Sequence, residues 1–411
     1  MQITAIHGDA LLDPATGETV RTATVLVEDG RVARAGRRDQ VHVPADARTV
    51  DAAGLTLLPG LIDCHVHLRS KGTGRDMVDW LTTPPTLWVL GVVPTSRTTL
   101  NAGFTSVRDG GGSPAGVRLA IERGYFPGPR TQVAISALAQ TGGHSDLFFP
   151  CGMDIRPPIA DIPPTVVDGV EPMRKRVREL IRAGADWIKL CTSGGMVSPS
   201  DSPHHATFTI DEIRAAVEEA AAQGRKVMAH AQALAGVKNA LRAGVATIEH
   251  GIWIDDEAVE MMLKWDRALV PTLAAPLWVI RHAEGGRMPK LMEDKARAVI
   301  DDHRTSIRRA IAAKVKIAFG TDTGVGAHGS MGEEFLLLNE LGMAPLDCIR
   351  AATTVAAEVL DRAGRIGTLA PGAFGDVIGV PGDPVADLGL LAKPESIRLV
   401  VTGGEVFKHL T

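Results

Sequence analysis

The sequence predicts an α/β protein built on a (β/α)8 TIM barrel, with a small β-sandwich domain formed from both ends of the chain. Its 411 residues are 45% hydrophobic and 22% charged, which supplies material for a sizeable core. Between about residues 59 and 365 apolar runs alternate with amphipathic helices, whereas both ends consist of short strands and turns. We therefore expect a composite β-domain of residues 1–58 plus 366–411 and a barrel over residues 59–365.

The two terminal segments carry hairpin and turn signals. Asp29-Gly30 separates two alternating apolar runs, and this dipeptide is typical of a tight β-hairpin. Residues 376–380 and 397–402 are short apolar runs, and the second is followed by the turn Gly403-Gly404. Strands from opposite ends of a chain can share one domain, because the termini of a domain often lie close together at its surface.

The middle of the chain carries the strand–helix alternation. Residues 187–190, 226–229 and 315–319 are short apolar runs typical of buried parallel strands. Thr209 and Glu212 form a capping box that predicts the start of an Ala-rich helix. Roughly eight such units fit a barrel. A doubly wound sheet is the alternative, but no Gly-x-Gly-x-x-Gly motif follows the first strand.

Composition narrows the expected partners and location. The chain has 44 Lys and Arg against 48 Asp and Glu, a net charge of −4 and no basic run, so we expect neither a nucleic-acid nor a membrane partner. Its four cysteines form no Cys-x-x-Cys pair, and its first residues lack the basic and apolar regions of a signal peptide. These features predict a cytoplasmic protein.

Polar side chains follow several of the predicted strands, and their types suit a metal ion. His65-Val66-His67 ends the first barrel strand, and residues i and i+2 of a strand share a face, so both rings can reach one ion. The other candidates at strand ends are Lys189, His230, His250 and Asp322. Barrel sites lie at the carboxyl ends of the strands, so all six should meet in one mouth, where their nitrogen and oxygen atoms suit Zn²⁺ or a similar divalent ion.

Lys189 has two interpretations. By itself a lysine at this position is expected to extend its ammonium toward water or to form an ion pair. A desolvated lysine, however, loses its proton more easily, and the neutral amine can add CO₂. The resulting carbamate has two oxygens that could bridge two metal ions. The other metal-ligating residues at the strand ends favour this second interpretation.

In combination these residues resemble the amidohydrolase superfamily, in particular its binuclear members with N6-carboxylysine. The motifs are Pro59-Gly60-Leu61-Ile62-Asp63-Cys64-His65-Val66-His67, Lys189, His230, Glu249-His250-Gly251 and Gly320-Thr321-Asp322-Thr323. Within the superfamily, Thr141-Gly142-Gly143-His144-Ser145-Asp146, Ser193-Gly194-Gly195 and His328-Gly329 are similar to prolidase-like and ochratoxinase-like amidohydrolases. Two positions depart from the pattern: Ser145 stands where Gly is commoner, and Gln232 stands where some relatives have a substrate-contacting Tyr.

The resemblance implies a role for each site residue. Two divalent metal ions, with Zn²⁺ the expected metal, would be held by His65, His67 and Asp322, by His230 and His250, and by carboxylated Lys189 between them. Asp322 would also act as general base and then acid, unless it is a ligand only. His144 would contact the substrate carbonyl, unless it packs as an ordinary loop histidine. Gln232 and His328 would also contact the substrate.

The implied activity is metal-dependent hydrolysis of a small-molecule amide. The expected substrates are dipeptides, Xaa-Pro-like ones among them, N-acyl amino acids and ochratoxin-type amides, cleaved by a homo-oligomer under a lid of residues 193–206. One rival is a cyclic amide hydrolase or deaminase of the imidazolonepropionase type, but such deaminases often carry Glu where Ala233 stands. A second rival, a catalytically inactive scaffold, would be expected to lack metal ligands.

Overall fold

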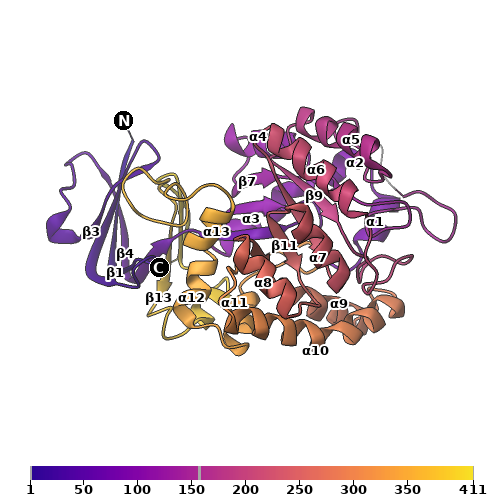
Figure 1. The fold of residues 1–411 in the computed structure, drawn as a ribbon. Coiled ribbons are helices and arrows are strands. Elements are labelled where there is room, and N and C mark those ends of the chain that lie inside the picture. Colours follow the sequence, from indigo (N-terminus) through magenta and orange to yellow (C-terminus); the bar gives the residue numbers. More distant parts are fainter. Residues whose placement is uncertain (1, 156–158, 411) are drawn as a thin grey trace.

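The computed structural model describes residues 2–155 and 159–410. Strands from both ends of the chain share one seven-stranded sheet, which lies beside a larger region of helices and parallel strands (Figure 1). Its order is β15-β14-β13-β4-β1-β2-β3. The strands are β1 (Ile3–Leu12), β2 (Thr19–Glu28), β3 (Arg31–Arg37), β4 (Arg48–Pro59), β13 (Val377–Pro381), β14 (Leu399–Thr402) and β15 (Glu405–His409). The expected sandwich is thus represented by a single sheet.

The hairpin and the alternation of apolar residues explain how this sheet forms. Asp29 and Gly30 join β2 to β3 with φ values of 43° and 80°, and two left-handed residues in succession give the turn that matches the twist of a hairpin. Along β1, Ala5 and Ile6 are fully buried in different apolar clusters, because successive side chains point to opposite faces. Both faces of β1 therefore pack against apolar side chains.

The remaining strands form two parallel sheets. One has the order β5-β6-β7 and the other β12-β11-β10-β9-β8. Their strands are β5 (Leu61–Val66), β6 (Phe104–Asp109), β7 (Arg130–Val133), β8 (Ala137–Leu138), β9 (Trp187–Cys191), β10 (Lys226–Ala231), β11 (Thr247–His250) and β12 (Ala268–Val270). The chain passes from β7 to β8 within a few residues, so the two sheets adjoin on that side.

On the other side the two sheets are connected through residues 316–319. The Leu269 N–H donates to the Lys316 carbonyl at 2.9 Å, and the Cys64 N–H donates to the Phe319 carbonyl at 2.8 Å. We expected a regular strand here, but the structure has only an isolated bridge at Ile317. The reason is competition for hydrogen bonds, because the Phe319 N–H donates to the Ala351 carbonyl at 3.0 Å instead of to β5.

Helices cover the outside of the parallel strands (Figure 1). They are α1 (Asp76–Thr82), α2 (Pro85–Leu90), α3 (Val92–Asn101), α4 (Ala115–Glu122), α5 (Val170–Arg182), α6 (Ile210–Ala222), α7 (Leu234–Ala243), α8 (Asp256–Lys264), α9 (Ala274–Glu284), α10 (Lys290–Ala312), α11 (Glu333–Glu340), α12 (Pro345–Ala351), α13 (Thr354–Val359) and α14 (Gly389–Ala392). The capping box predicted for Thr209 and Glu212 is present at the start of α6. A short 3₁₀ helix, Arg38–Gln40, follows β3.

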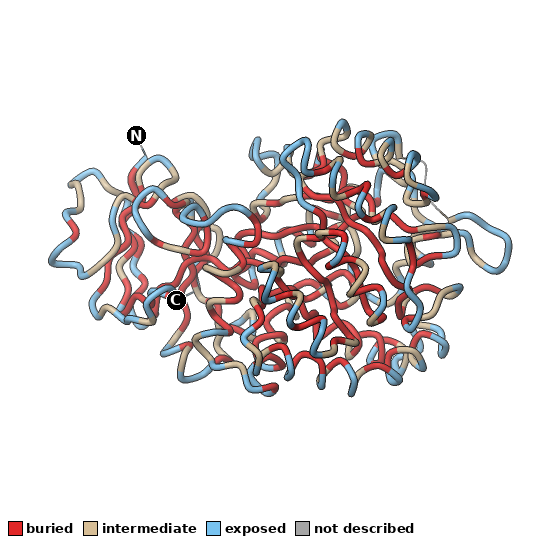
Figure 2. The backbone as a smooth tube through the Cα atoms, in the orientation of Figure 1, coloured by how far each residue is buried: buried red, intermediate tan, exposed pale blue. Residues whose placement is uncertain are grey.

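Burial is greatest along the parallel strands, and exposed segments lie at the periphery (Figure 2). Every residue of β5, β6, β9 and β11 is buried. Such strands have little freedom to shift, since a change of register would move side chains of the wrong size or polarity into the core. Polar groups at their ends are therefore held in fixed positions.

Candidate active site

The six strand-end candidates line one cavity of about 510 Å³. We call them the strand-end cluster: His65, His67, Lys189, His230, His250 and Asp322. His65 is on β5, Lys189 on β9, His230 on β10 and His250 on β11, while His67 and Asp322 lie just beyond strand-like segments. The parallel strands present their carboxyl ends to the same side, which is why residues far apart in the sequence meet here.

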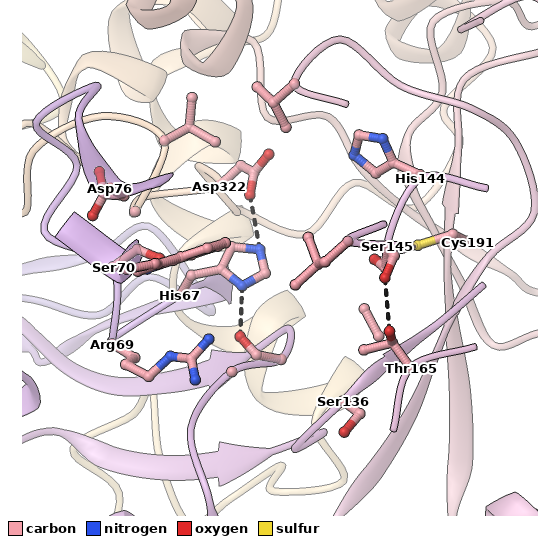
Figure 3. Close-up of a pocket in the computed structure, with 18 of the residues that line it drawn as sticks. His67, Arg69, Ser70, Asp76, Ser136, His144, Ser145, Thr165, Cys191 and Asp322 are labelled. Carbon is pink, nitrogen blue, oxygen red and sulfur yellow. Dashed lines mark hydrogen bonds and ion pairs between the residues drawn. The ribbon is translucent and has the colours of Figure 1, made fainter. Parts of the chain in front are cut away.

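The His67 side of the cluster is organised around Asp322. Its Oδ1 lies 3.1 Å from Nε2 of His67 (Figure 3). The same oxygen lies 3.5 Å from Nε2 of His65. Nδ1 of His67 donates to the Gly111 carbonyl at 2.8 Å, so Nε2 is the nitrogen left for a ligand. Asp322 has a φ of 60°, a left-handed backbone that its own N–H fixes by donating to the His65 carbonyl at 2.7 Å.

The other two histidines are also oriented by hydrogen bonds. Nδ1 of His250 lies 2.7 Å from Oγ1 of Thr272, which leaves Nε2 for the cavity. Nε2 of His230 lies 3.0 Å from the Gly194 carbonyl, which leaves Nδ1. The rings of His230 and His250 are 4.5 Å apart between centroids, and those of His65 and His250 are 5.1 Å apart. Ligand atoms of His65, His250 and Asp322 all lie within 4.8 Å of one another, as a shared metal ion requires.

The protonation states of the cluster also suit a metal ion. Burial lowers the pKa of His65 to about 4, and it lowers the pKa values of His230 and His250 well below the ordinary range, so these rings are neutral ligands at neutral pH. Burial would lower the pKa of His67 too, but the hydrogen bond and charge of Asp322 outweigh it and raise that pKa. Asp322 thus stabilises positive charge at the position where a cation would bind.

Lys189 is the sixth member of the cluster. Its Nζ lies 3.2 Å from Nε2 of His65 and is buried, and burial lowers the pKa of its amine below the ordinary value. A neutral amine is the form that reacts with CO₂, so this environment fits the carbamate expected from the sequence. Neutral imidazoles, one carboxylate and a buried lysine make a donor set that fits divalent metal ions.

A buried ion pair supports His65 from beneath. Nδ1 of His65 lies 2.8 Å from Oε2 of Glu249, and Nη2 of Arg108 donates to Oε1 of the same carboxylate at 2.9 Å. Both side chains are fully buried. Burial would raise the pKa of Glu249, but the charge of Arg108 and the hydrogen bond from His65 outweigh it and lower that pKa to about 2. The carboxylate therefore fixes the orientation and tautomer of the His65 ring.

His144 lies on the opposite side of the cavity from His67 (Figure 3). Its ring stacks on His230 with centroids 4.2 Å apart, and its Nδ1 lies 2.7 Å from Oγ of Ser198 and 3.2 Å from Oδ2 of Asp201. Gly195 is required here, because a Cβ at that position would come within 2.2 Å of the His144 ring. With Nδ1 occupied, Nε2 is the His144 atom available to a substrate.

Residues 193–206, the expected lid, are tied down rather than detached. Ser193 and Ala206 form an antiparallel bridge at the base of the loop. Nζ of Lys295 on α10 donates to the carbonyls of Ser198 and Asp201 at 2.7 and 2.6 Å. One lysine side chain from a distant helix therefore holds the loop that carries the partners of His144.

Gln232 and His328 lie away from the cavity wall. Gln232 is buried, its N–H donates to Oγ of Ser193 at 2.7 Å, and its Oε1 has no hydrogen-bond partner among the described residues. Nδ1 of His328 lies 3.0 Å from Oγ1 of Thr99, and its Nε2 donates to the Ser70 carbonyl at 2.9 Å. Both ring nitrogens of His328 are thus used within the fold, and the substrate contacts expected of Gln232 and His328 stay predictions.

Several residues around the site were missed by sequence reasoning. Arg69 and Trp80 line the cavity, and Asp201 and Lys295 organise the loop beside His144. A signal existed for Arg69, because His65, His67 and Arg69 are spaced by two residues, the repeat of an extended chain. The two loop residues had no comparable signal in the sequence.

The model of the amidohydrolase family matches residues 56–407 of the chain. The chain belongs to the amidohydrolase family. Over 420 aligned residues it is 33% identical to ochratoxinase of Aspergillus niger, an alignment that covers 99% of the chain and 87% of the relative. It is thus an enzyme, a hydrolase acting on amide bonds.

Solved structures agree with this membership. The chain is similar to a prolidase crystallised with N-methylphosphonate-L-proline, with a TM-score of 0.91, 36% identity and coverage of 99% of this chain and 100% of that one. It is also similar to a Xaa-Pro dipeptidase with methionine in its active site, with a TM-score of 0.89, 29% identity and the same coverage. In the part of the chain that the structure describes, no helix is both long and apolar enough to span a membrane.

A more distant relative represents the rival activity. Imidazolonepropionase of Nocardia farcinica is 27% identical over 419 residues, covering 96% of this chain and 95% of the relative. Its identity is lower than that of ochratoxinase over a similar length. The comparisons therefore favour amide hydrolases of the prolidase and ochratoxinase kind.

Proposed function

We propose that this amidohydrolase cleaves the amide bond of a dipeptide or an N-acyl amino acid, with two divalent metal ions held by the strand-end cluster. The observation that carries the proposal is that four histidines, one aspartate and one buried lysine converge on one cavity. Their support by Glu249, Thr272 and Gly111 leaves one nitrogen of each ring for a ligand. Zn²⁺ is the metal we propose first.

The assignment of ligands to the two ions follows from the family resemblance. His65, His67 and Asp322 would hold one ion, His230 and His250 the other, and a carbamate on Lys189 would lie between them. When bound, such ions lower the pKa of a water and polarise the substrate carbonyl. The ligand atoms of His65, His250 and Asp322 lie within 4.8 Å of one another, so residues assigned to the two ions lie close together.

The proposed proton transfers use Asp322 and His144. Asp322 accepts a proton from the attacking water and delivers it to the leaving nitrogen, so that a C–O bond forms as the C–N bond breaks. His144 donates through Nε2 to the carbonyl oxygen as negative charge develops there. Its Nδ1 contacts with Ser198 and Asp201 hold the ring in position for this role.

The architecture and setting complete the proposal. The two adjoining parallel sheets with helices outside them support a (β/α)8 barrel over residues 59–365, and the seven-stranded sheet supports a composite domain of residues 1–58 and 366–411.

Each of the four cysteines is free, which agrees with the reducing cytoplasm. We propose a homo-oligomer on the basis of the family resemblance alone.

The test is amine release from a panel of dipeptides, Xaa-Pro dipeptides and N-acyl amino acids. The protein is loaded with Zn²⁺ in bicarbonate buffer and its metal content is measured. The Lys189→Ala variant should lose activity, whereas Lys290→Ala, which removes an exposed lysine on α10, should keep it. Absence of amine release with two metals bound would contradict the proposal and favour cyclic amides or deamination, which the same preparation would then be assayed for.

A further inference from the structure

Arg69 is a cationic side chain on the cavity wall, and no carboxylate of the described residues forms an ion pair with it. It follows His67 by two residues, and its guanidinium points into the cavity beneath the His67 ring (Figure 3). Within the described parts of the chain the guanidinium makes no hydrogen bond or ion pair, and its Nε is buried. The side chain is partly buried, and a partly desolvated cation without a partner is costly.

The surroundings of Arg69 hold its guanidinium in place without neutralising it. Its Cζ lies 4.2 Å from the ring centre of Trp88 and 5.8 Å from that of Trp80, so the faces of two indoles orient the group. Gly112 leaves the necessary space, because a Cβ there would come within 3.3 Å of a terminal guanidinium nitrogen. The N–H edge of the guanidinium is therefore fixed and free to donate.

Two carboxylates lie nearby, but both are used by other donors. Asp109 accepts hydrogen bonds from the Leu68 N–H at 2.9 Å and from Oγ of Ser113 at 2.7 Å, among others. Asp76 lines the same cavity and accepts from the backbone N–H groups of Lys71 and Thr73. Neither forms an ion pair with Arg69. The fork-shaped guanidinium thus matches a planar carboxylate that arrives with a ligand.

We propose that Arg69 binds the free α-carboxylate of the substrate and so determines the preference for amides that carry one. In such a substrate the α-carbon alone separates the carboxylate from the scissile nitrogen. In Figure 3, Arg69 lies on one side of His67, and Asp322 and His144 lie on the other. The acyl part would therefore extend toward His144. Leu147 and Phe149, which follow His144 and line the cavity, would contact an apolar acyl group.

This inference rests on the proposed function and names the residue that recognises its substrate. The test uses two substrates that are identical except that one has a free α-carboxylate and the other its carboxamide. Wild type should hydrolyse the carboxylate at least about 100-fold better in kcat/KM, as expected for a desolvated charge pair. Arg69→Met keeps the packing against both tryptophans. In this variant the preference should disappear because kcat/KM falls for the carboxylate substrate and stays the same for the carboxamide.

Two further variants control the measurement. Arg69→Lys keeps the charge without the planar fork and should recover part of the preference. Arg75→Met removes an exposed arginine at the rim of the same cavity and should leave the preference unchanged. The melting temperature and metal content of each variant show whether the fold is retained, and activity on the carboxamide reports the integrity of the reacting centre.

A binding measurement separates failure of this inference from failure of the proposed function. The probe is an unreactive analogue in which a methylene replaces the scissile carbonyl, prepared with a carboxylate and with a carboxamide, and its affinity is measured by calorimetry. Carboxylate-dependent binding that is lost in Arg69→Met supports the inference even if no amide of the panel is cleaved. Equal affinity of wild type and Arg69→Met for the carboxylate probe, or equal losses of activity on both substrates, would overturn it.

Discussion

The cavity has two parts that are built in different ways. We call the side formed by the strand-end cluster the floor and the surrounding loops the walls. On the floor, four of the cluster residues lie on strands whose neighbours fix the backbone: His65, Lys189, His230 and His250. The walls consist of loops that depend on individual side chains, such as Lys295 holding the 193–206 loop. We expect the floor to determine the reaction and the walls to determine the choice of substrate.

The histidines in and beside the cavity differ in how many of their ring nitrogens form contacts within the fold. His65, His67, His230 and His250 each use one ring nitrogen within the fold and keep the other for the cavity. His328 uses both. The fold thus leaves one ring nitrogen free in each histidine of the strand-end cluster and none in His328.

The largest effect is expected at the floor. Asp322→Asn removes a ligand oxygen and the proposed proton carrier, so kcat should fall by more than about 1,000-fold. The measurement is amine release together with metal content and melting temperature. A variant that stays folded and within about tenfold of wild type would remove Asp322 from the proposed chemistry.

The support beneath the floor should matter for stability. Arg108→Met leaves Glu249 buried without its cation, which should lower the free energy of unfolding by about 3–5 kcal/mol. Chemical unfolding monitored by fluorescence measures it. Arg297→Met, which breaks an exposed ion pair on α10, is the matched control and should have little effect. Equal effects of the two substitutions would show that the buried pair is not a structural support.

An intermediate effect is expected in the walls. Lys295→Met releases the carbonyls of Ser198 and Asp201, so the 193–206 loop should become mobile and KM should rise about tenfold, with a smaller change in kcat. Lys290→Met, on the same helix but exposed, is the control. Steady-state kinetics and proteolysis of the loop provide the two measurements. An unchanged KM with rapid cleavage in the loop would separate the loop from substrate binding.

The smallest effect concerns the pH dependence of that loop. Burial would raise the pKa of Asp201, but hydrogen bonds from His144 and Ser198 and the charge of Lys295 outweigh it and lower that pKa below the ordinary value. A depressed folded-state pKa stabilises the fold above the pKa of the unfolded chain, and this stabilisation is lost as the pH falls. The difference in unfolding free energy between wild type and Asp201→Asn should therefore shrink between pH 6 and pH 3, where about 1–2 kcal/mol is expected to be lost. A difference that grows toward low pH would contradict this sign.

The floor could be predicted from the sequence, whereas most of the walls could not. Buried strands alternate their side chains and end at one mouth, so the positions of His65, Lys189 and His230 follow from local patterns. The contact between Lys295 and Asp201 joins residues 94 positions apart, and no local pattern encodes it. His328 was expected at the substrate because it follows Asp322, but its loop turns the ring toward Thr99 and Ser70.

Two departures have identifiable physical causes. The strand expected at residues 315–319 is interrupted because the Ala351 carbonyl takes the Phe319 N–H. Arg69 was overlooked although it continues the two-residue spacing of His65 and His67, because its importance depends on the lack of an ionic partner, which only the folded chain reveals. The unpaired charge of Arg69 and the free ring nitrogens of the cluster histidines both depend on the three-dimensional arrangement of the chain.

The most direct test of this division is the substrate preference of Glu249→Gln. This substitution weakens the support of His65 beneath the floor and leaves the walls unchanged. We predict that its activity falls about 10- to 100-fold, while its preference for the carboxylate substrate over the carboxamide stays within about threefold of wild type. A preference that falls in proportion to the activity would contradict the account, because floor and walls would then act as one unit.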